Sequence, residues 1–352
     1  MDCFSQDYAT ARARFRTGAA AARAAAFELP LSATGPHGEA LAIEVAWCGA
    51  AAPRRVLLHS SGLHGVEGFA GSAIQVELLA SMSEIPPAVA VAFVHVLNPY
   101  GMAWLRRVNE RNVDLNRNFL GPGESYAGHP DGYAGLDSFL NPAAMGFLDL
   151  FPVRAAWLIW KHGLAAVKRS VASGQYDYPN GLFFGGHEVE EVPRIYSQFL
   201  TTRLANVEQV IAIDVHTGLG PFGEDTLLVP ERDLSRMRQW FGERVQPVAS
   251  SDANVAYAVR GGLHDGLARV LDRARLTFVG QEFGTYSPIR VLGALRRENW
   301  GHRQADRPFP GPENLVLREV FCPADASWRR NVLKRGRDLY EKALGLLLED
   351  AG

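Results

Sequence analysis

The sequence has few cysteines, and none of them are paired at a metal-binding spacing. Its 352 residues contain Cys3, Cys48 and Cys322, which lie far apart in the chain. No C-x-x-C spacing occurs, which argues against a zinc site built from cysteines. An odd number of cysteines without a regular framework fits a reducing compartment, where disulfides are rare.

Signals for secretion, membrane insertion and nucleic-acid binding are also missing. Residues 1–8 lack the basic region and apolar run of a secretory signal. No stretch approaches the roughly 18 uninterrupted apolar residues that a membrane-spanning helix needs. Lys plus Arg number 36 against 38 Asp plus Glu, so nothing calls for nucleic acid or an anionic membrane as a partner. We expect a cytoplasmic globular protein, whose oligomeric state the sequence leaves open.

The sequence does contain short apolar segments that alternate with helical ones. Near-continuous apolar strands separated by helices are typical of a mostly parallel sheet covered on both faces. The predicted strands are residues 41–47, 55–59, 88–96, 210–215, 227–230 and 276–279, and the predicted internal helices are residues 69–82, 148–173, 194–204 and 234–245. We therefore expect one α/β domain over residues 1–352, with a mixed, mostly parallel central sheet flanked by helices on both faces.

Two more helices are expected at the ends of the chain. Residues 7–27 begin with a capping Asp7 and are rich in Ala and Arg, which are strong helix formers. Residues 328–350 form an amphipathic pattern with leucines at helical spacing. Residues 120–142 and 176–190 are expected to be long loops, and their length suggests a role in shaping the site.

Residues 60–68 contain the most informative chemical pattern. They place His64 and Glu67 three positions apart among glycines, directly after an apolar strand. A hydrolytic zinc ion needs three protein ligands and one open position. His216 and Glu282 each lie at the end of another predicted strand, and such strand ends are where α/β sheets bind ligands. We expect His216 as the third ligand and Glu282 as a base across from it.

Residues 104–119 are unusually rich in arginine. Arg106, Arg107, Arg111 and Arg117 lie within twelve residues, interleaved with asparagines and apolar residues. Arginine is favoured where a carboxylate must be held by two parallel hydrogen bonds. The segment therefore indicates a substrate that carries a carboxylate.

These patterns together resemble the zinc carboxypeptidase superfamily, which covers carboxypeptidase A-like peptidases and the succinylglutamate desuccinylase and aspartoacylase deacylases. The extended motifs look like a bacterial branch of that superfamily, which does not fix the substrate. Five motifs, within about residues 55–290 and in the order of the family, carry the resemblance: His64-Gly65-Val66-Glu67, Asn98-Pro99-Tyr100-Gly101, Val113-Asp114-Leu115-Asn116-Arg117-Asn118-Phe119, Asp214-Val215-His216 and Gln281-Glu282-Phe283.

The resemblance implies one Zn²⁺ per chain, held by His64, Glu67 and His216. It implies that Glu282 is the general base that activates the attacking water. Asp114 matches the carboxylate behind the first ligand histidine, where it orients the imidazole ring.

The resemblance also implies residues that contact the substrate. Asn116 and Arg117 match the pair that holds the substrate carboxylate. Arg107 matches best the arginine that stabilises the oxyanion of the tetrahedral intermediate, and Arg111 is the competing choice. Tyr257 lies in about the region of the mobile tyrosine of the digestive peptidases, although its surroundings do not align with that motif.

The expected function is zinc-dependent hydrolysis of an amide bond. Carboxypeptidase-like cleavage of a short peptide with a free carboxylate is the leading prediction. Deacylation of an N-acyl amino acid is the alternative, because both reactions need the same zinc, glutamate and arginine. A catalytically inactive metal-binding module remains a minor alternative. Substrate side-chain preference and the presence of a second metal stay open.

Overall fold

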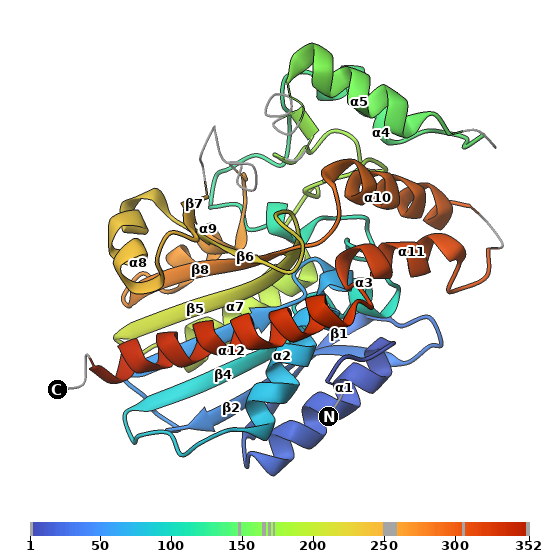
Figure 1. Cartoon of the computed structure of the whole chain (residues 1–352). Coiled ribbons are helices and arrows are strands. Elements are labelled where there is room, and N and C mark those ends of the chain that lie inside the picture. Colours follow the sequence, from blue (N-terminus) through green and yellow to red (C-terminus); the bar gives the residue numbers. More distant parts are fainter. Residues whose placement is uncertain are drawn as a thin grey trace.

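An eight-stranded sheet forms the centre of the molecule, with strand order β1-β2-β4-β3-β5-β8-β6-β7 (Figure 1). The computed structural model describes residues 3–146, 149–163, 167, 170–171, 173–248, 259–304 and 307–349. The strands are β1 (Ala25–Thr34), β2 (Ala40–Gly49), β3 (Arg55–Ser61), β4 (Val89–His95), β5 (Gln209–Gly218), β6 (Asp225–Val229), β7 (Val245–Pro247) and β8 (Arg275–Gly284).

The four central strands are parallel to one another. β4 pairs with β3, β3 with β5, and β5 with β8, all in parallel. The pairings β1–β2, β2–β4 and β8–β6 are antiparallel, and β6–β7 is parallel. The sheet is therefore mixed and mostly parallel at its centre, which confirms the predicted fold class.

Helices cover both faces of the sheet. α1, α2 and α12 pack on one face, and α7 and α9 pack on the other (Figure 1). No helix among the described residues is long and apolar enough to cross a membrane. The helices of eight or more residues are α1 (Tyr8–Ala21), α2 (Gly68–Ala80), α4 (Tyr133–Leu140), α5 (Phe151–His162), α7 (Glu191–Arg203), α8 (Leu234–Phe241), α9 (Leu263–Val270), α10 (Pro288–His302), α11 (Pro312–Phe321) and α12 (Ala326–Glu349).

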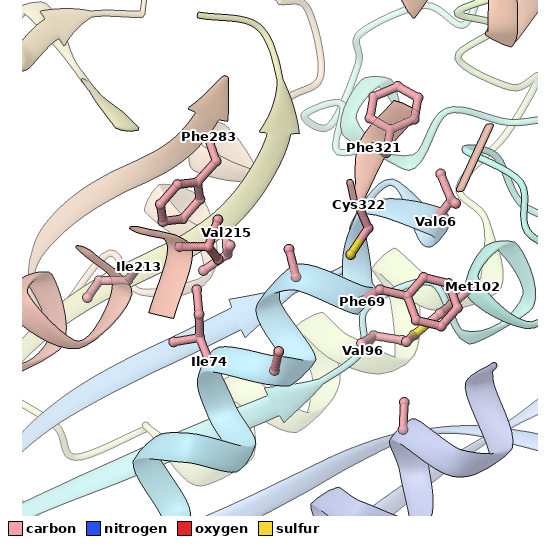
Figure 2. Close-up of a cluster of buried hydrophobic side chains, with 14 of the residues drawn as sticks. Val66, Phe69, Ile74, Val96, Met102, Ile213, Val215, Phe283, Phe321 and Cys322 are labelled. Carbon is pink, nitrogen blue, oxygen red and sulfur yellow. The ribbon is translucent and has the colours of Figure 1, made fainter. Parts of the chain in front are cut away.

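Side chains of β5 alternate between the two halves of the core. Ile211, Ile213 and Val215 face the α2 and α12 side, whereas Val210 and Ala212 face the α7 side. This period of two follows from the pleat of a strand that is buried on both faces. Figure 2 shows the first half of the core, where β5 and β8 meet α2 and the end of α11.

The predicted N-terminal helix over residues 7–27 is wrong at its C-terminal end. α1 ends at Ala21, and Ala25 begins β1, an edge strand that the prediction missed. The alanine run favours helix, but Arg23 adopts a φ of 54°, a left-handed conformation that ends the helix. The C-terminal helix matches the prediction within two residues, since α12 spans Ala326–Glu349.

The segment 120–142 is not wholly a loop, because α4 forms within it. α10 and α11, which follow β8, were not predicted either. α4, α5 and α10 contribute to a cavity beside the proposed metal site. One of the two predicted loops, residues 120–142, therefore contains a helix that lines this cavity.

Candidate metal centre

The three predicted zinc ligands come from two neighbouring parallel strands. His64 lies in the turn after β3, and Glu67 ends the 3₁₀ helix η1 (Gly65–Glu67) that follows. His216 lies near the carboxyl end of β5. The turn requires a glycine at position 65, because a Cβ there would lie 2.3 Å from the backbone oxygen of Arg106. This close approach of the two backbone segments positions His64 and Glu67 so that their side chains point to the same place.

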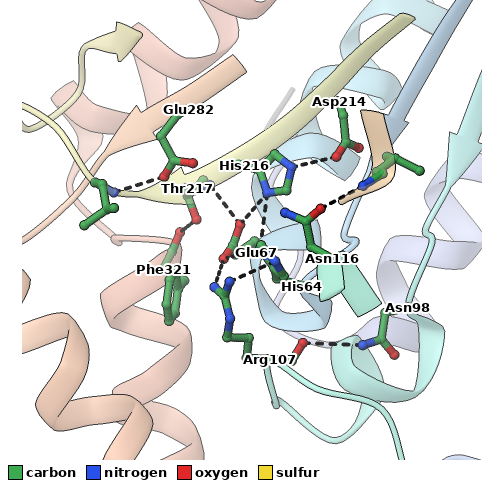
Figure 3. Close-up of polar contacts among 12 residues, drawn as sticks. His64, Glu67, Asn98, Arg107, Asn116, Asp214, His216, Thr217, Glu282 and Phe321 are labelled. Atoms are coloured by element: carbon green, nitrogen blue, oxygen red, sulfur yellow. Dashed lines mark hydrogen bonds and ion pairs between the residues drawn. The ribbon is translucent and has the colours of Figure 1, made fainter. Parts of the chain in front are cut away.

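The donor atoms of these three side chains converge, and all lie within 4.8 Å of one another. His64 Nδ1 is 3.1 Å from Glu67 Oε1, and His216 Nδ1 is 3.2 Å from Glu67 Oε2. The two Nδ1 atoms are 3.2 Å apart. Figure 3 shows the three side chains pointing toward one another from their separate elements. Two imidazole nitrogens and one carboxylate oxygen form a donor set suited to zinc.

A carboxylate lies behind each of the two histidines. His64 Nε2 is 3.2 Å from Asp114 Oδ1, and His216 Nε2 is 2.6 Å from Asp214 Oδ2. Such contacts select the tautomer and the orientation of a ligand imidazole, so both Nδ1 atoms are directed at the shared spot. Asp214 also accepts a hydrogen bond of 2.6 Å from the hydroxyl of Ser60, which holds it in place.

Sequence reasoning identified Asp114 as such a partner but missed Asp214. The sequence did contain a signal for Asp214, because Asp214 and His216 lie two positions apart on one strand and therefore point to the same face of the sheet. An acidic residue in an otherwise apolar strand is costly to bury without a partner. The pair Asp214 and His216 satisfies that requirement.

The charges around the centre favour a cation at the ligand atoms. Burial disfavours the ionised form of Glu67, but His64, His216 and Arg107 outweigh it and hold the pKa of Glu67 below its ordinary value. Burial disfavours the charged form of His216 as well, yet Asp214 and Glu67 raise its pKa well above the ordinary value. The neighbouring carboxylates therefore stabilise a positive charge on His216. A divalent cation at the same place would be stabilised in the same way.

Glu282 lies directly beside His216 in the sheet. The parallel register of β5 and β8 pairs the two residues. Glu282 Oε1 accepts a hydrogen bond of 3.0 Å from the backbone N–H of Leu219. Burial and the nearby charge of Glu67 raise the pKa of Glu282 to about 7. A carboxyl group with a pKa near neutrality is suited to accept and return a proton.

Of the two arginines considered for the oxyanion, Arg107 lies at the centre and Arg111 does not. The guanidinium of Arg107 donates to Glu67 Oε1 at 2.8 Å and lies 2.8 Å from His64 Nε2 (Figure 3). It also donates to Asp114 Oδ2 at 3.2 Å. The side chain of Arg111 is 51% exposed and pairs with Glu188 at 2.8 Å. The structure brings Arg107 together with the ligands and places Arg111 at the surface.

The remaining predicted substrate residues lie at different depths. Asn116 accepts a hydrogen bond of 3.0 Å from the N–H of Leu263 and lines a cavity next to the centre. Arg117 is fully buried, with its guanidinium 3.7 Å from Asp114, and it is not among the residues that line the cavities at the centre. Tyr257 lies outside the described residues.

Two cavities meet at the metal centre and share His64, Leu219 and Glu282 as walls. We call them the apolar cavity and the polar cavity. Arg107 lines the apolar cavity, and Asn116 lines the polar cavity. The apolar cavity is lined by His64, Glu67, Arg107, Leu136, Phe139, Leu140, Ala155, Leu158, Ile159, Val167, Val171, Phe183, Thr217, Gly218, Leu219, Glu282, Pro288, Ile289, Val291, Leu292, Leu295 and Phe321. The polar cavity is lined by His64, Asn116, Asp214, His216, Leu219, Leu228, Pro230, Glu231, Val248, Val259, Gly262, Leu263, His264, Asp265, Phe278, Gly280 and Glu282.

Comparisons with known proteins give one family and several similar folds. A family model described as "Protein of unknown function (DUF2817)" matches residues 4–335. A comparison with curated proteins found no match.

Three solved structures illustrate the similar folds. Carboxypeptidase A from Helicoverpa armigera is 13% identical with a TM-score of 0.45, covering 97% of this chain and 74% of that one. Murein-tripeptide amidase from Escherichia coli O157 is 14% identical with a TM-score of 0.36, covering 78% and 91%. A protein from Shewanella amazonensis SB2B, assigned to the succinylglutamate desuccinylase/aspartoacylase family, is 19% identical with a TM-score of 0.38, covering 77% and 69%. The first and third carry the names of groups that the sequence motifs resemble.

Proposed function

We propose that this chain, which belongs to the DUF2817 family, is a zinc-dependent hydrolase that cleaves an amide bond in a small, carboxylate-bearing substrate. One observation carries the proposal: the donor atoms of His64, Glu67 and His216 converge, and Glu282 lies beside them. Three ligands of this kind leave a position open for reacting groups, as a catalytic zinc site requires. The same constellation contains the base, which speaks against an inactive metal-binding module.

His64, Glu67 and His216 would hold the zinc ion. When bound, zinc supplies a Lewis acid that polarises a carbonyl group and lowers the pKa of water. Glu282 accepts the proton of the attacking water at its carboxylate and passes it to the leaving nitrogen. Arg107 donates to the carbonyl oxygen as negative charge develops there, an interaction worth about 3–4 kcal/mol in comparable sites.

The substrate lies across the centre, with one part in each cavity. Asn116 holds the carboxylate of the amine part in the polar cavity, whereas Arg117 lies buried beside Asp114 and does not line that cavity. The acyl part lies in the apolar cavity beside Arg107. Cleavage of a short peptide and deacylation of an N-acyl amino acid both fit this machinery. The wall of the apolar cavity favours deacylation, because away from the centre it has no polar side chain among the described residues that could bind a peptide backbone.

The test combines metal content with the loss of one carboxylate. Zinc-loaded protein is screened against short peptides and N-acyl amino acids, and the metal is quantified by mass spectrometry. Glu282→Gln should retain zinc and lose about 10²- to 10⁴-fold in kcat, since the charge that accepts the proton is gone.

The matched control is Glu44→Gln. Glu44 is also a buried carboxylate, but it pairs with Arg12 and Arg16 and lies outside the centre. The control should keep both zinc and turnover in its folded fraction. Full activity of Glu282→Gln would refute the assignment of the base, and a wild-type protein that cannot be loaded with zinc would refute the function itself.

A further inference from the structure

The polar side chains of the apolar cavity are gathered at one end. Among the described residues these are His64, Glu67, Arg107, Thr217 and Glu282. All five belong to the metal centre or adjoin it: the backbone N–H of Thr217, for example, donates to Glu67 at 3.1 Å. The rest of the wall is apolar and comes largely from α4, α5 and α10, which Figure 1 shows next to one another at one end of the molecule.

Such a wall accepts a chain of methylene groups and rejects polar groups. An amide or a carboxylate moved into it would lose its hydrogen bonds to water, and none of the described side chains of the wall could replace them. An apolar chain would instead gain about 0.8 kcal/mol for each methylene removed from water. The wall therefore discriminates against an extended peptide and against an acidic acyl group such as succinyl.

We propose that the apolar cavity binds an apolar acyl chain on the carbonyl side of the scissile amide, so that the substrate is an N-acyl amino acid with an unbranched aliphatic acyl group. The proposal rests on the function proposed above and deepens it. The orientation follows from the cavity walls, because Arg107 lines only the apolar cavity and Asn116 only the polar one. The carbonyl oxygen meets Arg107, and the carboxylate of the amino acid points toward Asn116.

The size of the cavity suits a chain of several carbons. Its volume is about 140 Å³. Apolar cavities of about 150 Å³ take up benzene, which has six carbons. A hexanoyl chain is therefore accommodated, and an acetyl group leaves most of the wall without contact.

α5 offers a matched pair of positions for testing the wall. Ala155, Leu158 and Ile159 line the cavity at helical spacing. Val153 lies on the same helix, is 66% exposed and does not line the cavity. A charge placed at Ile159 enters the cavity, and the same charge at Val153 enters solvent.

The first measurement is kcat/KM of zinc-loaded protein for acetyl, butanoyl, hexanoyl and octanoyl derivatives of the amino acid that is released fastest. We expect a rise of about fourfold per added methylene from acetyl to hexanoyl. The succinyl derivative should fall below the butanoyl one. Equal rates along the series, or a preference for succinyl or for a peptide with Leu before the scissile bond, would overturn the proposal.

The second measurement uses the matched variants. Ile159→Asp should lower the hexanoyl-to-acetyl ratio of kcat/KM at least tenfold, and Val153→Asp should leave the ratio unchanged. Leu292→Asp, in the α10 wall, repeats the test if Ile159→Asp fails to fold, which its melting temperature shows. An unchanged ratio in a folded wall variant would refute the role of the cavity.

A binding measurement distinguishes failure of this inference from failure of the proposed function. Hexanoate and acetate are titrated calorimetrically into wild type, Ile159→Asp and Val153→Asp. If hexanoate binds more tightly than acetate only when Ile159 is intact, and no amide is cleaved, the cavity assignment stands and the proposed hydrolysis fails. If amides are cleaved with no effect of chain length on rate or binding, the hydrolase stands and the acyl-chain inference fails.

Discussion

The proposed metal centre and the wall of the apolar cavity touch each other but are built in opposite ways. At the centre, polar side chains from β5, β8 and the turn after β3 are fixed by hydrogen bonds to one another, as in the contact of His216 with Asp214. In the wall, apolar side chains from α4, α5 and α10 form no hydrogen bonds themselves, and the helices that carry them are linked by Arg296, which donates to the backbone oxygen of Phe139 and to Asp149. α5 is exposed on its outer side, where Trp160 is 82% exposed, whereas the central strands are buried on both faces.

This difference separates the chemistry from the choice of substrate. A ligand or a base tolerates no change of functional group, because each role depends on a particular nitrogen or oxygen atom. An aliphatic wall tolerates exchange among Leu, Ile and Val, because only shape and apolarity matter there. Substitutions in the two regions should therefore change different quantities.

The largest effect is expected from removing a ligand. His216→Ala should abolish zinc binding and reduce turnover to background, because only two ligands remain and Asp214 loses one of its two partners. Metal analysis and an activity assay measure this, and chelation followed by zinc addition should switch wild-type activity off and on. The wall variant Ile159→Asp should keep its full zinc content. Loss of zinc in that variant would break the distinction between the two regions.

A smaller effect is expected from changing a carboxylate that contacts a proposed ligand. Asp214→Asn should weaken zinc affinity about 10- to 100-fold, because the amide holds the His216 ring less firmly and no longer favours the correct tautomer. Competition with a fluorescent chelator gives the affinity. Asp225→Asn is the control, since Asp225 is a buried carboxylate that pairs with Arg244 and Arg335 instead. Equal affinities in both variants would contradict the role given to Asp214.

The pH dependence of kcat/KM should reflect the ionisation of Glu282. Its carboxylate must be ionised to accept a proton, so kcat/KM should fall tenfold per pH unit below the pKa of Glu282 and level off above it. Burial and Glu67 place that pKa at about 7 without metal, and a bound cation lowers it. The acid limb should therefore have its midpoint at or below about pH 7. Activity that rises steadily toward pH 4 would exclude Glu282 as the base.

The smallest effect concerns stability and contrasts the two regions directly. Ile213→Ala in β5, where the side chain is 1% exposed, should lower the free energy of unfolding by about 2–5 kcal/mol. Trp160→Ala on the outer side of α5 should change it by less than about 0.5 kcal/mol. Urea unfolding measures both. A loss of several kcal/mol for Trp160→Ala would mean that this side of α5 is covered in solution.

The buried parallel strands and the order of the site motifs were predictable from sequence. β3, β4, β5 and β8 each contain a short apolar run, and His64, His216 and Glu282 each lie shortly after one of these runs. The structure brings these predicted residues together. Their roles as ligands and base stay predictions until metal and activity are measured.

Other parts could not be predicted, for physical reasons that differ. β1 is an edge strand with exposed and half-buried positions, so it has no apolar run, and the preceding alanines favour helix. Residues such as Leu292 and Ile159 line a cavity, yet an aliphatic residue in a helix has the same sequence pattern whether it faces a core or a substrate. Arg117 was predicted from its motif, but no pattern of charges reveals that its side chain is fully buried.

The position of α4 and α5 in the chain has a consequence for how the proposed acyl preference could change. Both helices lie between residues 120 and 190, whereas the proposed ligands and base lie at positions 64, 67, 216 and 282. An exchange of the stretch that holds α4 and α5, residues 133–162, replaces none of the proposed ligands and not the proposed base. A relative could therefore acquire a new acyl preference by recombination of one contiguous stretch, and a laboratory could transplant that stretch as a cassette.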